Sequence, residues 1–346
     1  MPDNPIQFGT SGWRGIIADN FTFANVRVAV FGDLIVDEFI YGDIARVSRE
    51  APVLILNYDS TQIVPGGAGN AASNVAALGG SAIAIGFTGQ DETGRRLLET
   101  LRPQVDVRPV VRPKGFRTPT KTRILAGGIH SAKQQVVRID RAATPAVADG
   151  DRRALRANLL KAAARCDALL VSDYGGGAVS APLVTEAGKL LRRPSRSKSP
   201  VLVDSRYSLL RYRGMTTCTP NESEVEQLLG IRIGDNTRIL ERAGRELLRR
   251  TRSDAVLITR GSRGMALFER DWRTVHIPIF GSDQIADVTG AGDTVIATMT
   301  LALAAGASFL ESAMLANYAG GLVVMKRGTA TVTADELRTA VRNDRG

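Results

Sequence analysis

Residues 287–297 read DVTGAGDTVIA, and the apolar run that follows them predicts a helix whose first turn is residues 290–293. The backbone N–H groups of such a turn attract an anion, and Gly290 and Gly292 let it come close. Asp293 would repel a statically bound phosphate. It suits a base that removes a proton from a hydroxyl attacking phosphorus. The stretch therefore predicts phosphoryl transfer, with Asp293 as an ordinary helix N-cap as the alternative.

Upstream of this stretch, segments with helical periodicity alternate with short apolar segments that are typical of buried strands. The helical segments are 151–166, 181–193, 222–230 and 236–250, and the strand segments are 167–174, 200–205 and 254–261. This alternation predicts an α/β fold with a mostly parallel central sheet, covered by helices on both faces. Ligands bind beyond the carboxyl ends of such strands. Short β segments within 44–66 and 107–141 are expected to form a small lid over that edge.

Composition and charge exclude several classes of function. The chain has 346 residues, 44% of them hydrophobic, with no apolar run of membrane-spanning length and no signal peptide, so a soluble, cytoplasmic protein is expected. Cys166 and Cys218 are read as buried side chains rather than as a disulfide or zinc site. The net charge of +10 comes from dispersed arginines, and only 5% of residues are aromatic. A basic cleft for a polyanionic small molecule fits this charge as well as a nucleic-acid surface does, so the charge alone does not decide the partner. The dispersed arginines and few aromatic residues argue against nucleic acid, and we expect neither a nucleic acid nor a membrane as partner.

Two further stretches carry candidate ligand-binding residues. In TPNESEVEQLLG (219–230), Asn221 and Glu224 have the spacing of a helix capping box. They could also face the phosphates of a nucleotide through Mg²⁺ and its water molecules. LITRGSRGMALF (257–268) reads as strand, glycine turn and strand, which could be a plain hairpin or could present its backbone to a nucleotide. Both interpretations are open for each stretch.

The motifs PGGAGNAASNVAALG (65–79) and DVTGAGDTVIA (287–297) lie more than 200 residues apart in this order, and together they resemble the ribokinase-like (PfkB) carbohydrate kinases. The resemblance covers about residues 27–341, so we expect a kinase domain over 26–341 and an extension over 1–25. It implies a three-layer α/β sandwich with a small β lid, ATP and Mg²⁺ as cofactors, and a homodimer formed through the lid. A sugar hydroxyl would attack the γ-phosphate of ATP.

The resemblance also implies roles for individual residues. Asp293 corresponds to the base, and the transferred phosphoryl group would be held by Gly290, Ala291 and Gly292. The nucleotide side would be formed by Asn221, Glu224, Thr259, Gly261, Gly264 and Asn317, with the metal ion held through water by Asn221 and Glu224. Sugar contacts map onto Asp33, Gly66, Gly67 and Asn70. The candidate cations for a substrate phosphate are Lys121, Arg123 and Arg138, which could equally be solvent-facing strand residues.

Within the family, the chain looks most similar to the heptose-7-phosphate kinases, on stretches such as TKTRILA (120–126), QQVVRIDRA (134–142) and SDYGGGAV (172–179). This implies phosphorylation of D-glycero-β-D-manno-heptose 7-phosphate to the 1,7-bisphosphate. A kinase for fructose, ribose or a hexose phosphate is the alternative, and a non-catalytic sugar-nucleotide sensor is a third reading. Gly176 departs from the pattern, since a lysine is usual there, and Arg206 stands where a lysine is common. The HxGH signature of a nucleotidyltransferase is absent, so only the phosphorylation step is expected.

Residues 8–27, FGTSGWRGIIADNFTFANVR, resemble the N-terminus of the phosphohexomutases. The phosphoserine loop and the metal-binding aspartate cluster that those enzymes need do not occur in this sequence. We therefore expect no mutase activity, and we expect residues 1–25 to be dispensable for catalysis.

Overall fold

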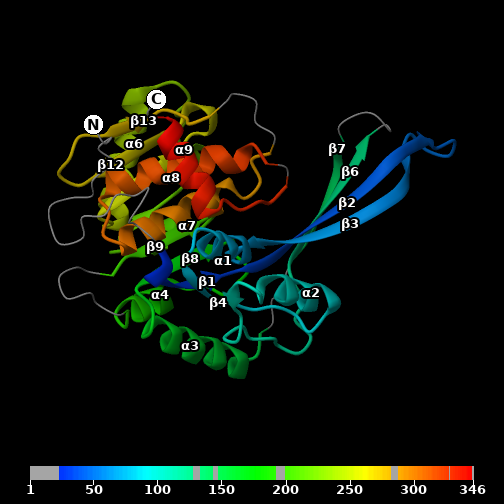
Figure 1. Ribbon diagram of the computed structural model, residues 1–346, viewed down its shortest axis with the longest axis horizontal. Helices are drawn as coiled ribbons and strands as arrows, with labels where there is room; N and C mark the ends of the chain where they lie inside the picture. Colours follow the sequence, from blue (N-terminus) through cyan, green and yellow to red (C-terminus); the bar gives the residue numbers. More distant parts are fainter. Residues whose placement is uncertain are drawn as a thin grey trace.

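The computed structural model describes residues 23–127, 133–142, 147–191, 199–281, 287–326 and 328–344, which form two sheets and the helices that cover them (Figure 1). In spatial order, the large sheet consists of β13 (Val275–Ile277), β12 (Met265–Glu269), β11 (Ala255–Thr259), β10 (Thr217–Cys218), β9 (Val201–Ser205), β8 (Ala168–Asp173), β1 (Arg27–Gly32), β4 (Ser81–Ile85) and β5 (Val105–Asp106). In this spatial order, all neighbouring strands from β11 to β5 pair in parallel, whereas β12 is antiparallel to β11 and β13 is antiparallel to β12. The predicted α/β class with a mostly parallel sheet is confirmed.

Helices cover both faces of the large sheet, because successive strand residues point to opposite sides. In β1, Val28 and Val30 join one buried cluster, and Ala29 and Phe31 join the other. The first face carries α1 (Ala68–Ala77), α2 (Glu92–Leu101), α7 (Ala291–Ala304), α8 (Phe309–Val324) and α9 (Ala334–Asn343). The second face carries α3 (Asp149–Ala163), α4 (Ala181–Gly188), α5 (Glu222–Leu229) and α6 (Thr237–Thr251). Figure 1 shows the resulting three layers.

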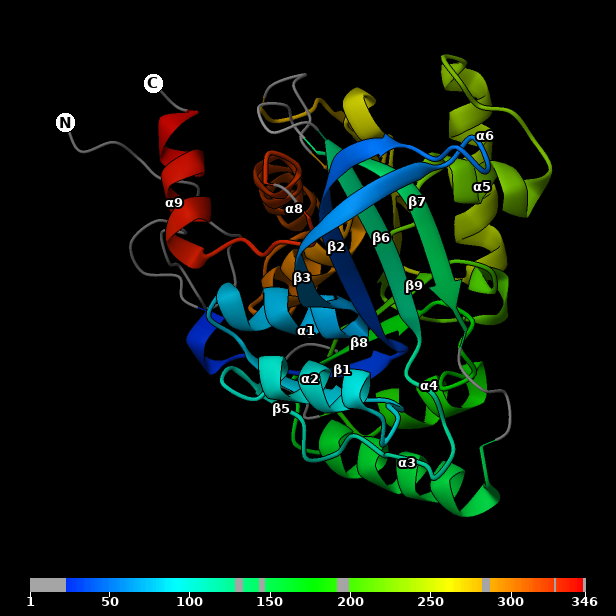
Figure 2. The ribbon, with the colours of Figure 1, turned by 90° about the vertical axis from the view of Figure 1, so that its right-hand side faces the viewer.

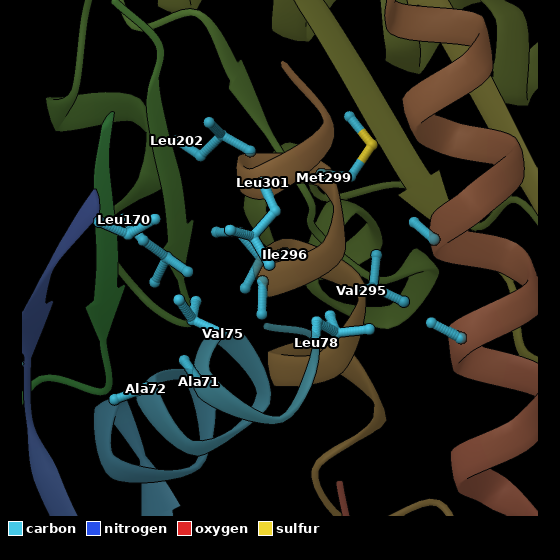
Figure 3. Close-up of a cluster of buried hydrophobic side chains, with 14 of the residues drawn as sticks. Ala71, Ala72, Val75, Leu78, Leu170, Leu202, Val295, Ile296, Met299 and Leu301 are labelled. Atoms are coloured by element: carbon cyan, nitrogen blue, oxygen red, sulfur yellow. The ribbon is translucent and has the colours of Figure 1, made fainter. Parts of the chain in front are cut away.

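Helix α7 lies in the middle of the first layer and is buried on almost every side. It packs against α1, α8 and the strands β8 and β9. Figure 3 shows Ile296 and Leu301 of α7 between Val75 of α1 and Leu202 of the sheet. A helix that is apolar all round is stable only in such surroundings. This packing determines where the first turn of α7, with Asp293, lies relative to the sheet.

The second sheet forms a lid that extends away from the body of the molecule (Figures 1 and 2). Its strands, in spatial order, are β3 (Leu54–Gly67), β2 (Leu34–Val47), β6 (Thr120–Gly127) and β7 (Gln134–Arg141). The predicted lid segments, 44–66 and 107–141, overlap these strands. The lid begins earlier than predicted, at Leu34, and residues 107–119 form turns and irregular structure before β6. Only Asp33 separates β1 from β2, so no turn signal marks the passage from one sheet to the other.

Most of the stretch resembling the phosphohexomutases lies outside the described residues, as does most of LLRRPSRSKSP (190–200), where the basic residues of the sequence are densest. The first described residue, Phe23, is 7% exposed and packs in the same core cluster as Val26. Among the described residues, no helix combines the length and the apolar character needed to cross a membrane.

The packing around α7 leads to a matched pair of substitutions. Met299 on α7 is fully buried, whereas Met314 on α8 is 38% exposed. We expect Met299→Ala to lower the free energy of unfolding by about 2–5 kcal/mol, because it leaves a cavity in a close-packed core. Met314→Ala should change it by less than about 0.5 kcal/mol. Urea unfolding of both variants measures the difference, and equal losses would contradict this description of the core.

Candidate active site

A cavity of about 430 Å³ lies at the carboxyl ends of four neighbouring parallel strands. Asp173, Asp204, Thr219 and Thr259 line it from the ends of β8, β9, β10 and β11, and the first turn of α7 closes one side. The same cavity brings together the ten residues assigned above to the nucleotide and to phosphoryl transfer: Asn221, Glu224, Thr259, Gly261, Gly264, Gly290, Ala291, Gly292, Asp293 and Asn317. They come from segments far apart in the chain.

Asp293 is the third residue of α7 and is 2% exposed. Its Oδ2 accepts a hydrogen bond of 2.9 Å from Asn70 Nδ2, and its Oδ1 accepts one of 3.2 Å from the hydroxyl of Tyr174. The residue at the N-cap position is Gly290, and no side chain caps the helix. The alternative reading of Asp293 as a helix N-cap is therefore wrong, and its carboxylate is directed at side chains of other elements.

The pKa of Asp293 is raised to about 7, chiefly by burial and also by the nearby charge of Asp37. The hydrogen bonds from Asn70 and Tyr174 and the charge of Lys121 act in the opposite direction. A carboxylate with a pKa near neutrality is well matched to proton transfer at physiological pH, because it is present in both forms. Asp293 therefore has the electrostatic properties of a general base.

The first turn of α7 offers free hydrogen-bond donors beside this carboxylate. Within the described part of the chain, the N–H groups of Gly292 and Asp293 have no acceptor, as is usual at a helix start. Gly290 has a φ of 80°, and a Cβ atom on it would lie 2.5 Å from Asn70 Nδ2. Only glycine therefore allows α1 and α7 to approach closely enough for Asn70 to reach the base.

Asn221 and Glu224 line the cavity and also form the capping box of α5. The N–H of Glu224 donates to Asn221 Oδ1 at 2.9 Å, and the N–H of Asn221 donates to Glu224 Oε2 at 3.0 Å. The structural reading of this motif is confirmed. It does not exclude ligand binding, because amide and carboxylate oxygens can accept further contacts.

The sequence analysis missed Asp204, a carboxylate of the large cavity. Burial raises its pKa well above the ordinary range, and the charges of Glu224 and Asp293 raise it further. Burial also raises the pKa of Glu224. The signal that could have found Asp204 is its position, since it lies at the end of β9 opposite Ser172 of β8, one residue before Asp173. No group of three His, Cys, Asp or Glu side chains that could hold a metal ion occurs in the described ranges.

A second cavity, of about 290 Å³, lies under the lid. Asp33, Lys121 and Arg138 line it, and Tyr174 and Arg206 line both cavities. The carboxylate of Asp33 accepts backbone hydrogen bonds from Tyr174 at 2.8 Å and Gly176 at 2.9 Å. Asp33 thus fixes the loop after β8, on which Tyr174 sits.

The three lid cations predicted to bind a phosphate behave differently. Lys121 faces the smaller cavity and, like Arg206, has no ion-pair partner among the described residues. Arg138 lines the cavity but forms a double contact of 2.9 Å with Asp140. Arg123 lines neither cavity, because it is bound to buried Asp37 at 2.5 Å. The interpretation of Arg123 as a phosphate ligand needs correction.

Gly66, Gly67 and Asn70, predicted to contact the sugar, line neither cavity. The amide of Asn70 is occupied by Asp293 and by the carbonyl oxygen of Gly290. A Cβ atom on Gly66 would lie 2.5 Å from Asp37 Oδ2, and Gly67 begins α1 with a φ of 54°. These residues therefore shape the surroundings of the base instead of lining the space for a sugar. From the sequence alone, residues that pack around Asp293 could not be distinguished from residues that line a sugar site.

The fold and the site together define a ribokinase-like carbohydrate kinase. The family model described as pfkB family carbohydrate kinase matches residues 27–336, and the chain belongs to this family. The bifunctional protein HldE of Halorhodospira halophila is 42% identical over 321 residues, covering 92% of this chain and 64% of that protein. The bifunctional protein HldE of Geobacter metallireducens is 39% identical over 315 residues, covering 90% and 62%. This chain therefore spans less than two thirds of the length of these relatives.

Two solved structures share the fold. Phosphofructokinase-2 from Escherichia coli, in complex with substrates and products, aligns with a TM-score of 0.72 at 20% identity, covering 92% of this chain and 98% of that chain. Ribokinase from Arabidopsis thaliana, complexed with ribose and ATP, aligns with a TM-score of 0.68 at 19% identity, covering 92% and 99%. At these identities the likeness concerns the fold alone.

Asn221 both caps α5 and lines the large cavity, which leads to a prediction with a matched control. Asn236 caps α6 through hydrogen bonds of 3.1 Å to two N–H groups, but it does not line the large cavity. Replacing either asparagine by alanine should lower the free energy of unfolding by about 1 kcal/mol, because a cap is lost. Only Asn221→Ala should also raise the KM for ATP, roughly three- to tenfold. Urea unfolding and steady-state kinetics measure the two effects. An equal rise in the KM for ATP in both variants would contradict a ligand role for Asn221.

Proposed function

We propose that residues 26–341 catalyse the ATP-dependent phosphorylation of a sugar phosphate, and that D-glycero-β-D-manno-heptose 7-phosphate is the favoured substrate, giving the 1,7-bisphosphate. The observation that carries the proposal is the buried carboxylate of Asp293, which lies next to free N–H groups at a helix start and accepts a hydrogen bond from Tyr174, a residue that lines both cavities. That arrangement supports phosphoryl transfer between ligands in the two cavities.

The large cavity suits ATP. Its lining includes the apolar side chains of Val288, Ile279 and Val324, glycines of α8 and the first turn of α7. An adenine ring would lie against the apolar side chains, and the phosphates would point at the N–H groups of Gly292 and Asp293. Arg206, which lines both cavities, would add positive charge where the phosphoryl group passes between them.

The transfer itself needs one proton acceptor and a set of donors. Asp293 takes the proton from the attacking sugar hydroxyl, and the N–H groups of Gly292 and Asp293 stabilise the charge on the transferred group. Asn221 and Glu224, which line the large cavity, carry the hard oxygen atoms that Mg²⁺ prefers, and they would hold the ion through water. When bound, Mg²⁺ neutralises charge on the phosphates of ATP.

The smaller cavity supports a substrate that carries a phosphate. Lys121 and Arg206 face it without carboxylate partners in the described ranges, so an uncharged sugar would leave both cations uncompensated. The resemblance to the heptose-7-phosphate kinases and the identity of about 40% with the HldE proteins favour a heptose. The missing lysine at position 176 fits the local geometry, because a Cβ atom there would lie 2.7 Å from Asp33 Oδ1.

We also propose that two copies of the chain associate through the lid. Apolar side chains are exposed on its strands, including Val47 at 58%, Val137 at 47% and Ile139 at 45%. The edge strands β3 and β7 leave backbone groups of the lid unpaired on their outer sides. A second lid would cover both features, which otherwise favour aggregation.

The substrate is tested by following ADP release with Mg²⁺-ATP and heptose 7-phosphate, fructose 6-phosphate, fructose or ribose. We expect turnover on heptose 7-phosphate and a loss of roughly 10²–10⁴-fold in kcat for Asp293→Asn, because the base is removed. Lys121→Ala should raise the KM for the sugar phosphate more than that for ATP. Turnover on an unphosphorylated sugar alone would refute the phosphate site, and full activity of Asp293→Asn would refute the mechanism.

The dimer is tested by sedimentation of the wild type and two charged variants. We expect the wild type to have twice the chain mass of 37.0 kDa. Val137→Asp should reduce the mass to that of one chain, because it buries a charge between apolar lids. Met314→Asp changes a comparably exposed residue outside the lid and should leave the dimer intact. A wild type with the mass of one chain would contradict the proposal.

A further inference from the structure

Tyr174 belongs to the wall that the two cavities share. It follows the last residue of β8, and among the described residues it is one of two, with Arg206, that line both cavities. Its hydroxyl donates to Asp293 Oδ1 at 3.2 Å, and Lys121 Nζ lies 4.8 Å from the centre of its ring. One side chain therefore contacts the proposed base and the proposed phosphate-binding lysine. The sequence analysis assigned it no role.

The two oxygens of Asp293 are held in different ways. Asn70, which holds Oδ2 at 2.9 Å, is itself fixed, because Asn74 Nδ2 donates to Asn70 Oδ1 at 3.1 Å. The hydroxyl of Tyr174 has no second partner among the described residues, and its 3.2 Å contact is long for an O–H···O hydrogen bond. The Oδ2 side of the base is thus rigidly bound, and the Oδ1 side is held by a contact that another hydroxyl can replace.

We propose that Tyr174 is a positioning residue that holds Asp293 Oδ1 at the wall shared by the two cavities and yields this oxygen to the sugar hydroxyl when the substrate binds. This inference rests on the kinase function proposed above. The sugar hydroxyl then donates to Oδ1 in place of Tyr174, and its proton passes to Asp293 as the new O–P bond forms. At the same time the bond from the γ-phosphorus to the bridging oxygen breaks, and ADP leaves with that electron pair.

The charges around Asp293 determine the sign of the expected effect. The groups that face it are Asp37 from β2, Lys121 from β6, Asp204 from the end of β9 and Tyr174 itself. Asp37 raises the pKa of Asp293, and the hydrogen bond from Tyr174 lowers it. Removing that hydrogen bond raises the pKa above its value of about 7. The base is active when deprotonated, so the acidic limb of the pH profile of kcat/KM moves to higher pH.

The test compares Tyr174→Phe with Tyr212→Phe. Tyr212 is a buried tyrosine nearby, but its hydroxyl donates to Asp173 at 2.7 Å and does not touch Asp293. For Tyr174→Phe we expect kcat/KM for the sugar at pH 7 to fall about two- to fivefold, with the loss recovered at higher pH, because the pKa of Asp293 rises in the free enzyme. The value of kcat should change little, because Tyr174 no longer donates to Asp293 Oδ1 once the sugar is bound. Tyr212→Phe should follow the wild-type profile, whereas an unshifted Tyr174→Phe profile would overturn the proposal.

A second measurement does not depend on turnover. The carboxyl group of Asp293 is titrated by infrared difference spectroscopy and identified by the band that disappears in Asp293→Asn. We expect a midpoint near pH 7 in the wild type and a higher midpoint in Tyr174→Phe. A shifted midpoint without kinase activity would refute the proposed function and leave the contact with Tyr174 standing. Equal midpoints would refute the role of Tyr174, whichever sugar is phosphorylated.

Discussion

The hydrogen bond between Asn70 of α1 and Asp293 of α7 joins two residues that lie 223 positions apart in the chain, and the rest of the site depends on it. It can form only because small residues let the helices approach, above all Gly290, whose added Cβ would strike the amide of Asn70. The contact keeps a carboxylate buried beside the free N–H groups of a helix start. Those groups and that burial are what the proposed reaction needs, a base and a place for developing negative charge.

The buried position of Asp293 explains why so many polar groups are arranged around it. Asp37 lies near Asp293 and is paired with Arg123, and Glu224 lies near Asp204 and accepts a hydrogen bond from the N–H of Asn221. Arg123 neutralises Asp37 and is therefore unavailable to a ligand, whereas Lys121 and Arg206 are left facing the cavities. The lid is thus both a wall of the smaller cavity and the source of the charge that balances the base.

Sequence reasoning reached the fold class, the family and the residues around the large cavity, because these depend on local patterns. The helical and strand periods, the glycines of residues 287–297 and the capping-box spacing at Asn221 are visible along the chain. It failed where a side chain has a choice of partners. Arg123 could not be distinguished from Lys121, since both lie on β6 and point to the same side of the lid. Asn70 was assigned to the sugar although its amide is bound to Asp293.

The sequence by itself determined that this chain builds a parallel sheet covered by helices and places an acidic residue at the start of a helix with glycine-rich surroundings. The tertiary structure alone decided that Asp293 is a buried carboxylate with a raised pKa and not a helix cap, and that Tyr174 and Arg206 line both cavities. The physical reason is that periodicity and backbone conformation are local properties of the chain. Burial, charge interactions and hydrogen-bond partners depend on which distant segments the fold brings into contact.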